Sequence, residues 1–80
     1  MKLIILSPKK EVFKGNIKSV KVPGHNGQFE VLSNHAPIVS ALTEGEVRVI
    51  TSKDETKKFG IQKGFIEVLN NEVSLLVRLS

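Results

Sequence analysis

The two histidines are the side chains of this sequence with the widest range of possible chemistry. His25 and His35 are accompanied by no cysteine, no tyrosine and no tryptophan in 80 residues. An imidazole serves as a general base or a metal ligand only where a nucleophile or further ligands converge on it. Ten residues separate the two rings, no third ligand follows at a suitable spacing, and Asp54 is the only aspartate. We therefore expect no catalytic residue, no metal site and no cofactor.

A glycine-containing segment offers the second kind of chemistry, which is phosphate binding. Gly24 and Gly27 lie within the sequence Pro-Gly-His-Asn-Gly. Phosphate loops place their glycines in a G-x-G-x-x-G or G-K-[ST] pattern that opens a helix, and this segment has neither pattern. The segment predicts a tight turn.

Basic residues and one phenylalanine suggest nucleic-acid binding as an alternative function. The net charge is +4, and the excess lies in residues 1–40, where six lysines face Glu11 and Glu30. Such an excess suits an acidic protein, a nucleic acid or anionic lipid headgroups. The segment Lys63-Gly64-Phe65 resembles part of the nucleic-acid-binding strand of small basic β-barrels, which stack bases on several aromatic rings. Only four phenylalanines are present, so we expect Phe65 to belong to the core.

The elements that must position these residues are short strands. Glycine, proline or asparagine interrupts the chain every few residues, which excludes a long helix. In residues 73–79 every second side chain is apolar, and the side chains between them are polar or apolar. Asn70-Asn71 joins this segment to a preceding strand at hairpin spacing. A change of phase near Lys18-Ser19 indicates a β-bulge, and 52–58 reads as a solvated hairpin tip.

These patterns predict an all-β fold. We expect residues 1–80 to form a single domain, a small antiparallel β-sandwich or flattened barrel of about eight to ten short strands. The longest apolar run, Leu3–Leu6, is too short for a transmembrane helix or a signal peptide. The absence of cysteine favours a reducing compartment, and we expect a soluble, cytoplasmic chain.

The segment 34–38, Asn-His-Ala-Pro-Ile, is a polar-to-apolar corner that composition does not require. It is either a structural corner, in which His35 bonds to the backbone and Pro37 fixes φ, or a contact for a partner. At this corner, and along nearly all of the chain, the sequence resembles the epsilon subunit of the F-type ATP synthase, called delta in mitochondria. The resemblance covers the N-terminal β-sandwich domain of that family. Its most specific part is the N-H-A-P corner at this distance after Pro23-Gly24, with Ser7-Pro8 and Gly64-Phe65-Ile66-Glu67-Val68 in support.

The resemblance implies a non-catalytic central-stalk (rotor) subunit that docks the gamma subunit onto the c-subunit ring and couples proton translocation to ATP synthesis. Through these partners it would work with the alpha/beta hexamer, peripherally, on the cytoplasmic side of the energy-transducing bacterial inner membrane. Family members commonly continue into two α-helices that inhibit ATP hydrolysis and in some members bind ATP. This sequence stops at Ser80, so we expect a short form without that helical domain.

The resemblance also implies two sets of contact residues. Those implied to face gamma are Ser7, His35, Ala36, Pro37 and Ile38, with Ser7 near the corner and with Pro37 and Ile38 at the apolar centre of the contact. Those implied to face the c ring are Asn26, Gly27, Gln28, Phe29, Leu42, Thr43 and Glu44. The family often has an acidic residue at the position of Gln28.

Overall fold

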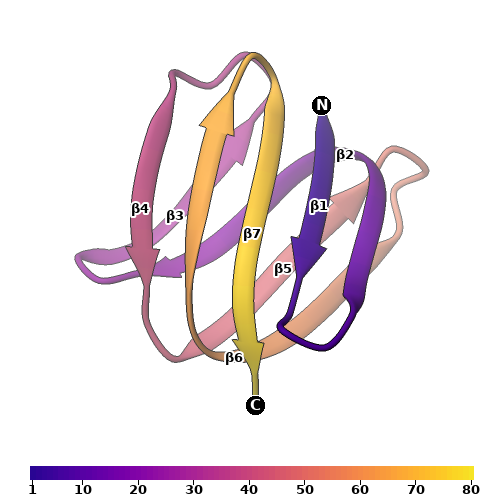
Figure 1. The fold of residues 1–80 in the computed structure, drawn as a ribbon. Coiled ribbons are helices and arrows are strands. Elements are labelled where there is room, and N and C mark those ends of the chain that lie inside the picture. Colours follow the sequence, from indigo (N-terminus) through magenta and orange to yellow (C-terminus); the bar gives the residue numbers. More distant parts are fainter.

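Seven strands and no helix make up the computed structural model, which describes residues 1–80 (Figure 1). The all-β prediction is confirmed, but the number of strands is lower than expected. The strands are β1 Lys2–Leu6, β2 Glu11–Gly24, β3 Gly27–Leu32, β4 Ile38–Leu42, β5 Gly45–Thr51, β6 Thr56–Leu69 and β7 Glu72–Leu79.

Two long strands account for the lower number, because β2 and β6 each run for 14 residues. The first part of β2 pairs with β1, and its second part pairs with β3 and β5. The first part of β6 pairs with β5, and its second part pairs with β4 and β7. Each long strand therefore passes from one layer of the sandwich into the other instead of breaking into two strands.

Irregular pairing marks the place where each long strand changes layer. The register of β2 against β5 shifts between Ile17 and Ser19, which confirms the bulge predicted near Lys18-Ser19. A second shift, between Ile61 and Lys63 in β6, was not predicted, although Ile66 and Val68 share a parity that Ile61 does not. An extra residue increases the local twist, and this lets one strand serve two sheets.

One layer contains β4, the second part of β6, β7 and β1, and the other contains β3, the second part of β2, β5 and the first part of β6. β1 and β7 pair in parallel, so the expectation of a purely antiparallel sheet is wrong for this pair. A hairpin forces neighbouring strands to be antiparallel. The first and last strands are joined by the whole chain, and no such constraint acts on them.

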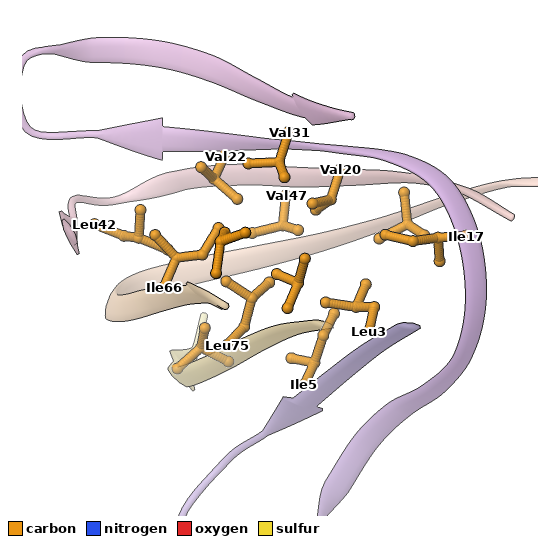
Figure 2. Packing of buried hydrophobic residues seen from close by; sticks show 14 of the residues in the cluster. Leu3, Ile5, Ile17, Val20, Val22, Val31, Leu42, Val47, Ile66 and Leu75 are labelled. Atoms are coloured by element: carbon orange, nitrogen blue, oxygen red, sulfur yellow. The ribbon is translucent and has the colours of Figure 1, made fainter. Parts of the chain in front are cut away.

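The core lies between the layers (Figure 2). It contains 15 buried aliphatic residues. In β7 the inward side chains of Val73, Leu75 and Val77 are at most 4% exposed, whereas Leu76 is 55% exposed. This confirms the predicted alternation. The hairpin between β6 and β7 is also confirmed, since Asn70 and Asn71 have φ values of 52° and 62°, as a two-residue hairpin turn requires.

Candidate docking surface

The histidines do not form a chemical site. His25 lies exposed in the two-residue turn between β2 and β3, and His35 lies in the corner between β3 and β4. No group of three His, Asp or Glu side chains is close enough together to hold a metal ion. The segment from Pro23 to Gly27 is the tight turn that its sequence predicted. The candidate functional sites are therefore the surfaces of the sandwich.

Hydrogen bonds hold the corner 33–37 in place. The backbone N–H of His35 donates to Leu32 O at 3.2 Å, and its ring Nδ1 lies 2.7 Å from Ala36 O. Asn34 has a φ of 65°, and its N–H donates to Oδ1 of Asn71 at 2.9 Å. His35 thus bonds to the backbone, as the structural interpretation of the corner expects, and Ala36 and Pro37 are exposed beside it.

Ile38 and Val39 leave the corner in opposite directions. Ile38 stands opposite Val68, is half-buried and packs against the core. Val39 stands opposite Glu67 and is 74% exposed. The outward residue next to Pro37 is thus Val39, which was not among the predicted contact residues.

Ser7 lies at the other end of the sheet. It follows β1 and turns the chain, since its Oγ accepts the N–H of Lys10 at 3.2 Å. β1 and β4 run in the same direction (Figure 1), but the corner precedes β4 whereas Ser7 follows β1. The expectation that Ser7 lies near the corner is therefore wrong, because the strand direction separates them by the length of the sheet.

The outer surface between these two ends carries most of the exposed apolar side chains. Phe65 stands opposite Ala41 on one side and opposite Leu76 on the other, and Leu76 stands opposite Leu6. The exposed fraction is 58% for Phe65 and 55% for Leu76. Contiguous exposed apolar side chains of this kind mark interaction sites on soluble domains. We call this surface the apolar face, and its members are Ile4, Leu6, Val39, Ala41, Phe65, Leu69 and Leu76.

The sequence contains a signal for this face. Apolar residues occupy both parities of a strand at Phe65-Ile66 and at Leu75-Leu76-Val77. One parity fills the core, and the other must face outward. The expectation that Phe65 belongs to the core is wrong for this reason, because the buried position is that of Ile66, which is 0% exposed.

The residues implied to face the c ring come together at one end of the sandwich. Gly24, next to the β2–β3 turn, pairs with Leu42, and the N–H of Thr43 donates to Pro23 O at 2.8 Å. Asn26, Gly27, Gln28, Thr43 and Glu44 are exposed there, and we call them the hairpin end. Leu42 is 1% exposed and Phe29 packs against the core, so these two side chains fix the loops in position.

The N-terminal lysines are divided between the two layers, with Lys2 and Lys14 on the neighbouring strands β1 and β2 of the layer that carries the apolar face. Lys9 and Lys10 lie in the β1–β2 turn, and Lys21 stands opposite Glu30 on the other layer. Lys18 donates to Asp54 Oδ1 at 2.6 Å, at the tip between β5 and β6. Of the aromatic residues, Phe13 and Phe59 contact each other and are partly buried, so no row of exposed rings accompanies Phe65. The platform that a nucleic-acid-binding barrel needs is not formed.

Fold and surface together define a β-sandwich whose exposed features suit protein docking. Comparison with known proteins gives its family. Residues 1–79 match the family model of the ATP synthase delta/epsilon chain, β-sandwich domain. The chain belongs to this family.

Two curated relatives illustrate the match. The ATP synthase epsilon chain of Chlorobaculum tepidum is 46% identical over 74 residues, which are 92% of this chain and 84% of the relative. The epsilon chain of Protochlamydia amoebophila is 40% identical over 74 residues, and there the matched region is only 50% of the relative. This chain thus spans most of one relative and about half of the other.

Two solved structures share the fold. In a mitochondrial ATP synthase structure of Euglena gracilis with OSCP, F1 and c-ring, one chain superposes with a TM-score of 0.88 at 19% identity, over 94% of this chain and 48% of that chain. In a structure of the central stalk and c-ring of the Tetrahymena thermophila mitochondrial ATP synthase, one chain superposes with a TM-score of 0.83 at 16% identity. The match covers 98% of this chain and 63% of that chain. None of the comparisons supports a nucleic-acid-binding function. The structure also contains no helix that could span a membrane.

Proposed function

We propose that this chain is a non-catalytic subunit of the central stalk of an F-type ATP synthase and that its apolar face docks on the gamma subunit. The observation that carries the proposal is the exposure of Val39, Phe65 and Leu76 on one sheet, in a chain that belongs to the epsilon family. Burying such side chains against a partner is favourable by about 25 cal/mol per Å² of apolar area. A stalk subunit under torque needs this kind of well-packed contact more than exposed ion pairs.

The corner and Ser7 lie at the two ends of this docking surface. His35, Ala36 and Pro37 would meet gamma beside Val39, and Ser7 would meet it beyond Leu6. Ile38 packs against the core and so holds the start of β4 in position beneath this contact. The corner and Ser7 therefore belong to one continuous contact surface only if the apolar face between them also contacts gamma.

The hairpin end would face the polar loops of the c ring. Asn26, Gly27, Gln28, Thr43 and Glu44 offer amide, hydroxyl and carboxylate groups, and Phe29 and Leu42 hold them in place from the core. In this arrangement the chain is peripheral to the membrane, on the cytoplasmic side of the bacterial inner membrane. The alpha/beta hexamer would be reached through gamma.

The sandwich would couple proton translocation to ATP synthesis mechanically. β4 begins at the corner and ends at the hairpin end, and it is paired along its length with β6 (Figure 1). A force applied to the hairpin end is carried along these hydrogen-bonded strands to the apolar face. No group of the chain needs to react or to bind a cofactor.

Binding to purified partners tests this function. We expect the chain to form a complex with the gamma subunit of the same organism and the resulting pair to bind the c ring more tightly than gamma alone does. Leu76→Asp, at an outward position, should abolish the complex and leave the melting temperature nearly unchanged. A folded chain that binds neither gamma nor the c ring would refute the proposal.

A further inference from the structure

A pair of cations borders the apolar face next to the Phe65–Leu76 pair. Lys63 and Arg78 stand directly opposite each other in the antiparallel pairing of β6 and β7. They share the outward parity of Phe65 and Leu76, which form the next outward pair along the same two strands. Both side chains are exposed. A groove on this surface is lined by Leu6, Phe65 and Leu76 and by both cations.

This cation pair is unfavourable in the free domain. Like charges directly opposite each other in an antiparallel pair destabilise a sheet. The structure contains one ion pair, between Lys18 and Asp54, so no carboxylate neutralises Lys63 or Arg78. Either residue could be neutral or acidic without disturbing the core, because both side chains point away from it.

The half of the face toward the corner carries both signs of charge, since Lys2 stands opposite Glu72 and Lys14 stands opposite Ile4. Glu67 stands between Val39 and Ser74, and Glu72 stands opposite Leu69. Lys63 and Arg78 thus lie in line with Phe65 and Leu76 along the two strands, at the end of the face nearest the hairpin end. A partner that covers Phe65 and Leu76 meets these two cations at one end, and a complementary charge on the partner favours one orientation.

We propose that Lys63 and Arg78 bind a carboxylate of the partner that covers the apolar face. This inference rests on the proposed function, so the partner is an apolar segment of the gamma subunit with an Asp or Glu at the end nearest the hairpin end. The guanidinium of Arg78 offers two parallel N–H donors to such a carboxylate, and Lys63 adds a point charge. Docking then relieves the repulsion that the free domain carries.

A charge reversal with a matched control tests the inference. Lys63→Glu places a carboxylate opposite Arg78, and Lys58→Glu places one opposite Arg48 on the other layer. Both variants change the net charge equally and replace a cation–cation pair by an ion pair, so neither should lower the melting temperature. Binding of each variant to purified gamma would be measured by calorimetry at about 50 and 300 mM salt.

We expect Lys63→Glu to weaken gamma binding by about tenfold or more at low salt and to reduce its salt dependence, with Lys58→Glu within about twofold of the wild type. Equal binding by the wild type and Lys63→Glu would overturn the inference and leave the proposed function intact. Equal loss in both variants would also overturn it, since net charge alone would then explain the effect. A wild-type chain that fails to bind gamma would overturn both.

Discussion

Replacing Phe65 by threonine separates docking from folding. The ring is 58% exposed, which corresponds to about 120 Å² of apolar surface for an aromatic side chain. At about 25 cal/mol per Å², covering this area contributes at most about 3 kcal/mol to docking. Threonine retains roughly a third of the contact, so we expect a loss of about 2 kcal/mol, or about 30-fold in affinity for gamma.

The free domain should tolerate the same change. Threonine is favoured in strands, and the ring of Phe65 lies on the outer face, so the melting temperature should fall by less than about 4 °C. Leu32→Thr is the matched control, because Leu32 is 54% exposed on the other layer. Calorimetric titration with gamma measures the affinity, and circular dichroism measures the melting temperature. An unchanged affinity for Phe65→Thr, or an equal loss for Leu32→Thr, would refute the assignment of the apolar face.

Further predictions concern the corner and the approach of β6 to β7. Ile38→Asp should unfold the domain or lower its melting temperature by more than about 8 °C, because it places a carboxylate against the core. Val39→Asp should leave the melting temperature unchanged and weaken gamma binding. The reverse pattern would contradict the inward direction of Ile38 and the outward direction of Val39. Asn71→Ala should lower the free energy of unfolding in urea by about 2 kcal/mol, because alanine is strained in the left-handed conformation and lacks the acceptor for the N–H of Asn34. Asn71→Gly removes the acceptor without the strain and should lower it by about half as much. Equal losses would contradict the strain argument. Gly64→Ala should lower the melting temperature by about 5–20 °C, since its Cβ would lie 2.5 Å from a backbone carbonyl of β7, and a melting temperature equal to that of the wild type would contradict this packing.

Local features of the fold could be predicted from the sequence because they depend on neighbouring residues. The Asn70-Asn71 hairpin, the turn at 25–26 and the alternation of β7 each depend on residue types a few positions apart. The bulge in β2 was visible as a change of phase. The resemblance around the N-H-A-P corner led to the family that the comparisons confirm.

Features that depend on which strands become neighbours could not be predicted. The continuity of β6 through both layers depends on its pairing with three other strands. The parallel pairing of β1 with β7 joins residues more than 60 positions apart. The separation of Ser7 from the corner follows from the shared direction of β1 and β4.

By itself, the sequence determined the all-β class, the hairpins and the family of this protein, because short-range patterns and a shared motif encode them. Only the tertiary structure decided that Phe65 and Leu76 face outward and stand side by side with Ala41 and Leu6. The physical reason is that both parities of these strands are apolar, so composition cannot tell the buried face from the exposed one. The closure of β7 against β1 and β6 makes that choice, and it assembles the apolar face from four separate segments of the chain.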